Sequence, residues 1–279
     1  MLDFSPLGLA EPPFSLSPDP RFFFLSTQHK TALAKITYTA EQRQGLSVVY
    51  GDVGVGKTTI ARRLYQMYND NPQFVAAYLP MPIFPSEFQL LKAICSEFGL
   101  PPKRSKYAQI ELFNAYLIDV WKQGNNAVLI IDEAQALVGR QFELIRQLLN
   151  FESNTQKLIQ IIMIGQNELR NKLRLKKPLR SRIATRSTIE PLDLHDTRDM
   201  INFRVMVAGR MSPLFTEEAI QAIYRHLREH DDNPCAVIPT GVPTGAPSST
   251  LLGAAFTSTA GSGARFTSVR TTSLPVSET

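Results

Sequence analysis

Residues 51–58 read Gly51-Asp52-Val53-Gly54-Val55-Gly56-Lys57-Thr58, and this stretch decides the fold because it matches the phosphate-binding pattern G-x-x-x-x-G-K-[ST] at every fixed position. Its glycines let the backbone curl so that successive N–H groups face inward onto a phosphate. Lys57 supplies a positive charge to the β- and γ-phosphates, and the Thr58 hydroxyl is placed to hold Mg²⁺. We therefore predict that residues 51–58, extended by Thr59, bind the phosphates of a nucleotide.

The sequence on either side of this loop supplies the order of elements that such a loop requires. Residues 46–50 form a short apolar run with β-forming side chains and predict a buried strand. Residues 59–68 carry apolar side chains at helical spacing, so a helix begins here with its positive N-terminal end facing the anion. This order favours nucleotide binding over a glycine turn that binds nothing.

The length and composition are those of a soluble globular protein. The chain has 279 residues, of which 43% are hydrophobic and 20% charged, enough for a core domain with a smaller appendage. Only Cys95 and Cys235 are present, and no secretory signal or membrane-spanning apolar stretch is found, so we expect a cytoplasmic protein. The net charge of +5 permits a nucleic-acid partner without requiring one.

Strands and helices alternate along the middle of the chain. Beyond the first strand, strands are predicted at 74–79, 127–131, 158–164 and around 187–189, and helices at 88–98, 110–121 and 142–149. This alternation predicts an α/β fold, a parallel sheet covered by helices on both faces. Its ligand should bind at the carboxyl ends of the strands.

Four segments are expected along the chain. They are an N-terminal segment and helix that pack on the core (1–45), a nucleotide-binding domain (46–192), a small partial helical lid (193–230) and a tail rich in Ser, Thr, Gly and Pro (231–279). The aromatic run 22–25 must be buried, and Ser26 is the expected N-cap of the first helix. The tail has few charges and no helical period, so we expect it to be disordered.

Two further sites follow buried strands. Asp132 and Glu133 come directly after the strand 127–131, where Asp132 can hold Mg²⁺ and Glu133 can activate water as a general base. An acidic turn after a core strand is the alternative. Gln166 follows the strand 158–164 and can reach the γ-phosphate or the water; a strand-capping amide without a catalytic role is its alternative.

Four stretches of this chain occur in the same order in a known family. They are residues 14–26, the loop 51–58, Ile-Ile-Asp-Glu-Ala-Gln at 130–135 and Met-Ile-Gly-Gln-Asn-Glu-Leu at 163–169. With these stretches the chain resembles the ExeA/GspA-type AAA+ ATPases, which are related to the TnsC/TniB transposition ATPases, over roughly residues 4–229. The resemblance implies the AAA+ P-loop fold with a five-stranded sheet, hydrolysis of ATP with Mg²⁺, and a homo-oligomer, ring or filament, whose sites are completed between subunits.

The resemblance also places residues 179–183 in the arginine-finger region. Arg182 would reach the γ-phosphate held by the adjacent subunit, with Arg180 as the second choice. Both belong to a stretch from Arg170 to Arg186 that contains eight Lys and Arg and no Asp or Glu. This stretch is either a solvated face, a subunit contact or a surface for DNA phosphates.

The end of the chain departs from the family. Members continue after the region of Phe215 and Thr216 into a Gly-x-Pro-Arg segment and a final helix, whereas residues 230–234 lead here into the tail, as a truncated or frame-shifted coding sequence would. Three roles stay open. The first expectation is a DNA-linked regulator of a transposase. The alternatives are an ATPase of the general secretion pathway that assists an envelope complex through a secretion membrane protein, and a nucleotide-dependent scaffold with negligible turnover.

Overall fold

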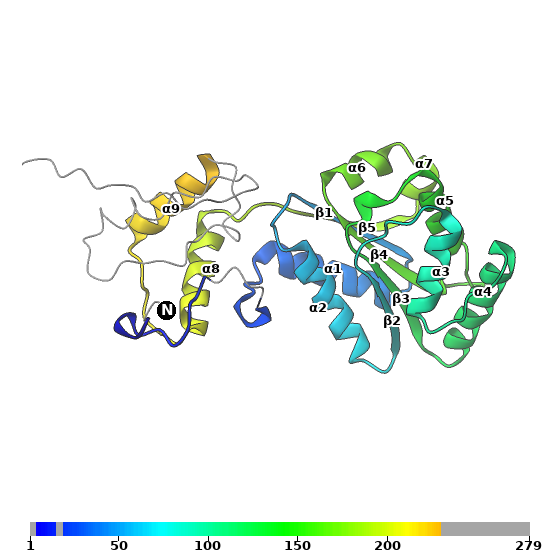
Figure 1. Ribbon diagram of the computed structural model, residues 1–279, viewed down its shortest axis with the longest axis horizontal. Coiled ribbons are helices and arrows are strands. Elements are labelled where there is room, and N and C mark those ends of the chain that lie inside the picture. Colours follow the sequence, from blue (N-terminus) through cyan, green and yellow to red (C-terminus); the bar gives the residue numbers. More distant parts are fainter. Residues whose placement is uncertain (1–3, 15–18, 230–279) are drawn as a thin grey trace, which may run out of the picture.

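The computed structural model of the chain describes residues 4–14 and 19–229. Its centre is a five-stranded parallel sheet in the order β2-β3-β4-β1-β5 (Figure 1). The strands are β1 (Leu46–Gly51), β2 (Phe74–Leu79), β3 (Asn126–Ile131), β4 (Ile159–Gly165) and β5 (Ile183–Ile189). The fold class expected from the sequence is therefore confirmed.

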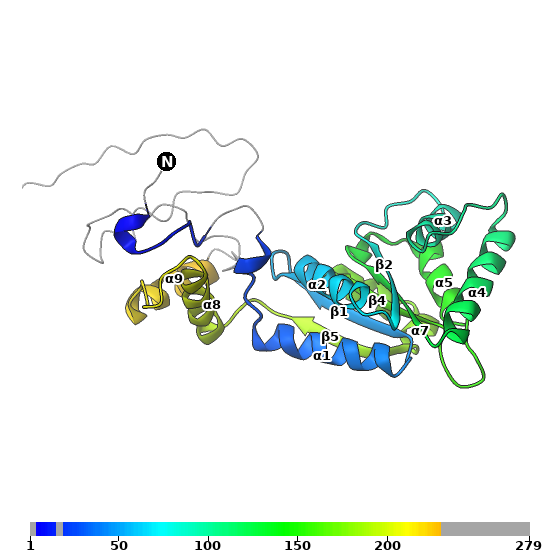
Figure 2. The same ribbon diagram turned by 90° about the horizontal axis from the view of Figure 1, so that it is seen from below.

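Helices cover both faces of this sheet (Figures 1 and 2). On one face lie α1 (Thr27–Glu41) and α2 (Lys57–Asn69). On the other face lie α3 (Glu87–Glu97), α4 (Lys106–Lys122), α5 (Gly139–Leu148), α6 (Asn167–Arg174) and α7 (Lys177–Arg180). Short 3-10 turns are η1 (Ser5–Leu7), η2 (Pro20–Phe22) and η3 (Ala134–Ala136).

The central strands are buried on both faces, which is why they form nearly continuous apolar runs in the sequence. In β3 the side chains of Val128 and Ile130 join the cluster under α1 and α2, while those of Leu129 and Ile131 join the cluster under α3 to α5. Burial of each such side chain contributes about 1.5–3 kcal/mol. The edge strand β5 buries only part of its residues, so its sequence signal is confined to 187–189 although the strand begins at Ile183.

Side-chain caps set several of the helix starts. Ser26 caps α1 as expected, its Oγ accepting the N–H of His29 at 3.4 Å. Helix α4 begins before the expected Ile110 because Ser105 Oγ accepts the N–H of Ala108 at 3.1 Å. Apolar spacing places the middle of a helix well, but the polar cap decides where the helix begins.

The last two helices, α8 (Leu194–Val207) and α9 (Glu217–Glu229), lie beyond one end of the sheet together with the N-terminal segment (Figure 2). One hydrophobic cluster joins them, formed by Leu9, Phe14, Phe22, Leu192, Met200, Ile201, Val205, Ala208 and Ile220. The backbone N–H of Ala10 also donates to the carbonyl of Ala208 at 2.7 Å. The N-terminal segment is thus packed against the two C-terminal helices that the structure describes.

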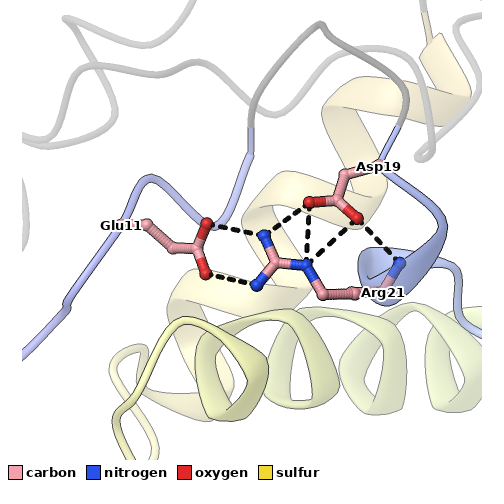
Figure 3. A network of polar contacts seen from close by, with 3 residues as sticks. All are labelled: Glu11, Asp19 and Arg21. Carbon is pink, nitrogen blue, oxygen red and sulfur yellow. Dashed lines mark hydrogen bonds and ion pairs between the residues drawn. The ribbon is translucent and has the colours of Figure 1, made fainter.

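Polar contacts hold this N-terminal segment in shape. The Arg21 guanidinium lies between the carboxylates of Glu11 and Asp19 (Figure 3), with N–O distances of 3.0 and 2.6 Å. The aromatic run that follows is divided between two surroundings. Phe22 and Phe24 contact the cluster of α8 and α9, whereas the ring of Phe23 lies 5.5 Å from that of His29 beside the phosphate loop.

Residues 231–279, expected to form a disordered tail, lie outside the described residues, and the boundaries of the four expected segments stay a prediction. Within residues 4–14 and 19–229, no helix combines the length and the apolar character needed to cross a membrane.

Candidate nucleotide-binding site

The strand order brings the expected site residues to one edge of the sheet. Strand β4 lies between β1 and β3, with Tyr50 beside Gly165 and Ile131 beside Met163. All strands are parallel, so the carboxyl ends of β1, β3 and β4 meet at the same edge. The phosphate loop, the Asp132–Glu133 pair and Gln166 are the segments that follow these three ends.

The loop between β1 and α2 has the shape of a phosphate cradle. Gly54 and Gly56 have φ of 79° and 86°, a conformation that favours glycine. At Gly51 a Cβ would lie 2.6 Å from the carbonyl oxygen of Ile189 and 2.7 Å from Cγ2 of Val55. Helix α2 begins at Lys57, so the N–H groups of its first turn have no partner within the helix and remain for an anion.

Lys57 is a buried cation among carboxylates. Its side chain is 6% exposed, and Nζ donates to the carbonyl of Asp52 at 2.5 Å. Burial lowers the pKa of Lys57, while the charges of Glu133 and Asp132 oppose this change. The residue types and their placement fit a site in which Lys57 would leave the Asp52 carbonyl and bind a polyphosphate instead.

Asp132 is the most buried carboxylate of the site. It is 1% exposed and accepts hydrogen bonds from the N–H of Glu133 at 2.9 Å and the hydroxyl of Tyr78 at 3.3 Å. Burial raises the pKa of Asp132, and a hydrogen bond from Thr58 opposes this increase. Because Mg²⁺ prefers carboxylate and hydroxyl oxygens, the pair of Thr58 and Asp132 fits the ion that the sequence predicts.

Glu133 and Gln166 are joined by a residue that the sequence did not single out. The Gln135 amide nitrogen donates to the Glu133 carboxylate, and its Oε1 accepts the backbone N–H of Gln166 at 3.0 Å. Gln135 stood within the family stretch 130–135, but nothing in its residue type indicated a bridge. Both Glu133 and the Gln166 side chain are half-buried at the expected edge, and their catalytic roles stay predictions.

A second link joins the end of β4 to the phosphate loop. The side-chain amide of Asn167 donates to the Asp52 carboxylate at 2.5 Å. His29 on α1 also lies against this loop, because a Cβ at Gly56 would be 3.2 Å from its Nε2. Hydrophobic periodicity could not reveal His29, because its partner is the carbonyl of Val55 in a distant part of the chain.

The two candidate arginines are placed differently. Arg182, the first choice, is half-buried and donates from Nη1 to the carbonyl of Arg146 at 2.9 Å. Arg180, the second choice, is exposed, and within the described part of the chain its side chain has no hydrogen bond or ion pair. Neither position tests a contact between subunits, so the arginine finger stays a prediction.

The basic stretch runs along α6, α7 and the first part of β5. Three of its members donate to carbonyls of their own chain. They are Arg182 as described, Lys172, whose Nζ donates to the carbonyls of Gln135 and Leu137, and Arg186, whose Nη2 donates to the carbonyl of Arg180 at 2.9 Å. Six of the eight side chains, Arg186 among them, are exposed. This set, named the basic face, consists of Arg170, Arg174, Lys176, Lys177, Arg180 and Arg186.

Comparison with known proteins identifies related sequences. The AAA domain family matches residues 40–173. The chain is 37% identical over 222 residues to General secretion pathway protein A of Aeromonas hydrophila, and the match covers 78% of this chain and 40% of that protein. The expected resemblance to ExeA/GspA-type proteins is thereby confirmed, and the chain spans less than half the length of this relative.

Solved structures share the fold at lower identity. ORC2 of Aeropyrum pernix, with ADPNP and ADP, has a TM-score of 0.55 and 16% identity over 76% of this chain and 59% of its own. The ORC1 protein of the same organism in complex with DNA has a TM-score of 0.56 and 16% identity, covering 80% and 61%. A Walker-type ATPase of Pyrococcus abyssi has a TM-score of 0.54 and 18% identity, covering 80% and 68%. These structures show the shared fold alone. The AAA domain match and the 37% identity to General secretion pathway protein A identify the chain as an AAA+ P-loop protein related to the ExeA/GspA-type proteins.

Proposed function

We propose that this protein binds ATP with Mg²⁺ and hydrolyses it to ADP and phosphate. The observation that carries the proposal is the placement of the buried Lys57 and Asp132 beside the half-buried Glu133, which gathers a cation, a metal ligand and a base at the end of one sheet. Lys57 and the N–H groups of residues 51–59 would hold the phosphates, and Thr58 and Asp132 the ion. When bound, Mg²⁺ neutralises charge on the β- and γ-phosphates.

In this proposal Glu133 takes a proton from the attacking water, and Gln166 orients the water or the γ-phosphate. An arginine of a second copy of the chain completes the site in a homo-oligomer, ring or filament. Between the two candidates, Arg180 has the more accessible side chain, because Arg182 is held by the Arg146 carbonyl.

Phosphate release tests the ATPase proposal. The full chain with Mg²⁺ and ATP should release phosphate, whereas the Lys57→Ala variant should neither bind ATP nor release phosphate. ATP binding by the parent without phosphate release would replace the ATPase proposal by the third role, a nucleotide-dependent scaffold. The absence of ATP binding by the folded parent would overturn both.

We propose the secretion role as one biological setting, in the cytoplasm and in contact with a secretion membrane protein that belongs to an envelope complex. It is supported by the 37% identity to General secretion pathway protein A. The match covers 40% of that relative, so the remaining length of the relative has no counterpart in this comparison. Co-purification of the tagged full chain with a membrane protein of the envelope, dependent on ATP, is the expected result.

A DNA-linked role, regulating a transposase, is the second candidate, and the basic face supports it. Replacing Arg174, Lys176 and Lys177 together by Ala should weaken DNA binding and reduce its log–log salt slope by about 3, because each phosphate contact contributes close to one unit. The matched control replaces Lys30, Lys35 and Arg63, which are exposed outside this face. Equal binding by the two triple variants, or no binding by the parent at low salt, would remove this role.

A further inference from the structure

The amide of Gln135 forms a bridge between two strand ends. Its nitrogen donates to the carboxylate of Glu133 after β3, and its oxygen accepts the N–H of Gln166 after β4. Only this orientation is consistent with both partners, because a flipped amide would set oxygen against a carboxylate and NH₂ against an N–H. One side chain therefore satisfies a donor and an acceptor from two different strands.

The surrounding backbone is shaped for this bridge. At Gly165 a Cβ would lie 2.7 Å from Gln135 Oε1, so glycine is what allows the amide to approach the end of β4. Glu133 has φ of 49°, a left-handed conformation that costs a residue with a side chain about 1–2 kcal/mol. This turn leads directly into η3, which carries Gln135 and contacts β4.

The short helix η3 is also fixed from outside. Lys172 on α6 donates to the carbonyl of Gln135 at 2.5 Å and to that of Leu137 at 3.2 Å. Helix α6 itself begins directly after Gln166. Helix α6 therefore holds both ends of the bridge. A displacement of Gln166 would be transmitted to the Glu133 carboxylate through the side chain of Gln135.

We propose that Gln135 is a positioning residue for ATP hydrolysis, which aligns the carboxylate of Glu133 with the end of β4 that faces the γ-phosphate. The proposal rests on the ATPase function proposed above. Gln135 makes no contact with the nucleotide in this scheme. It acts through Glu133, so its loss should lower kcat and leave the affinity for ATP unchanged.

Two substitutions separate the two halves of the bridge. Gln135→Met keeps the unbranched shape and removes both hydrogen bonds. Gln135→Glu keeps an acceptor for the Gln166 N–H, removes the donor to Glu133 and sets two carboxylates side by side. The matched control is Gln123→Met, because Gln123 is an exposed glutamine that follows α4 at the opposite edge of the sheet.

Four quantities are measured on each variant of the chain: kcat and KM for ATP, the Kd for ATP, and the hydrogen-exchange rate of the Gln166 amide without nucleotide. Both Gln135 variants should lose roughly ten- to a hundred-fold in kcat, with KM and Kd within about two-fold of the parent. The Gln166 amide should exchange about ten-fold faster in Gln135→Met and stay protected in Gln135→Glu. Gln123→Met should match the parent throughout.

The possible outcomes test separately whether the hydrogen bonds of Gln135 exist, whether Gln135 positions Glu133, and whether the protein hydrolyses ATP. An unchanged kcat in either Gln135 variant overturns the positioning role, even if the amide exchanges faster. An unchanged exchange rate in Gln135→Met overturns the bridge, whatever happens to kcat. A parent that releases no phosphate overturns the ATPase proposal and the positioning role with it, while the exchange rates still report on the bridge.

Discussion

Nε2 of His29 lies 2.9 Å from the carbonyl oxygen of Val55, which connects α1 to the phosphate loop. The backbone N–H of Ser26 donates to the other ring nitrogen, Nδ1, at 3.3 Å, so Nδ1 is the acceptor and Nε2 carries the proton. The ring of Phe23 packs edge-on against the imidazole. A neutral histidine of fixed orientation therefore supports the backbone of the loop that should hold the phosphates.

Replacing His29 by Phe should weaken both the fold and the nucleotide site. The variant keeps a ring but leaves the Val55 carbonyl and the backbone N–H of Ser26 without their side-chain partner, at a cost of about 1–3 kcal/mol in the free energy of unfolding. Urea unfolding and ATP titration measure the two effects. The control is His195→Phe, because the His195 side chain is 69% exposed. Equal stability of the two variants would contradict the supporting role of His29.

The stability should also depend on pH through His29. Burial lowers the pKa of His29 below its ordinary 6.5, and the hydrogen bond to Val55 and the charge of Asp196 oppose this shift. Below pH 6.5 the unfolded chain therefore binds a proton at this residue that the folded chain does not. The free energy of unfolding consequently decreases as the pH is lowered from 6.5 towards the pKa of the folded state. The stability advantage of the parent over His29→Phe should shrink as the pH falls through this window. An advantage that grows on acidification would contradict the neutral form.

Gly51→Ala should damage the loop through a steric clash. The added Cβ would meet the carbonyl oxygen of Ile189 at 2.6 Å, and this backbone atom of β5 cannot move aside without disturbing the sheet. We expect the free energy of unfolding to decrease by about 1–3 kcal/mol, and ATP binding to be lost in the same variant. At Gly139 a Cβ meets nothing closer than 3.8 Å, so Gly139→Ala should be neutral or stabilising. Comparable melting temperatures would refute the clash.

Local elements of this structure could be predicted from the sequence, whereas contacts between residues far apart in the chain could not. Strand β2 was predicted with its observed bounds, and the loop 51–58 and Asp132 lie after β1 and β3 as predicted, because spacing along the chain determines these positions. Their binding of phosphate and Mg²⁺ stays a prediction. The bridge of Gln135 and the contact of His29 join separate elements, and no periodicity encodes such a pair. The basic stretch likewise gave no sign that Lys172 and Arg182 would be held by carbonyls of their own chain.

The choice between the two arginines can be tested by mixing subunits. Arg180→Ala should bind ATP but lose about 100-fold or more in kcat, since a finger contributes 10³–10⁵ where it has been measured. Mixed with Lys57→Ala subunits, it should regain turnover at about one site in four, because each active site then draws on two different subunits. Arg182→Ala should lose stability through the Arg146 carbonyl, and mixing should not restore it. Recovery by Arg182→Ala alone would assign the finger to Arg182.

The central claim, that one edge of the sheet both binds ATP and hydrolyses it, depends on Glu133. The most direct test compares ATP binding and phosphate release in the parent and in Glu133→Gln, under conditions where ATP saturates both. We predict that Glu133→Gln binds ATP with the affinity of the parent and releases almost no phosphate. Phosphate release by this variant at the rate of the parent would contradict the account.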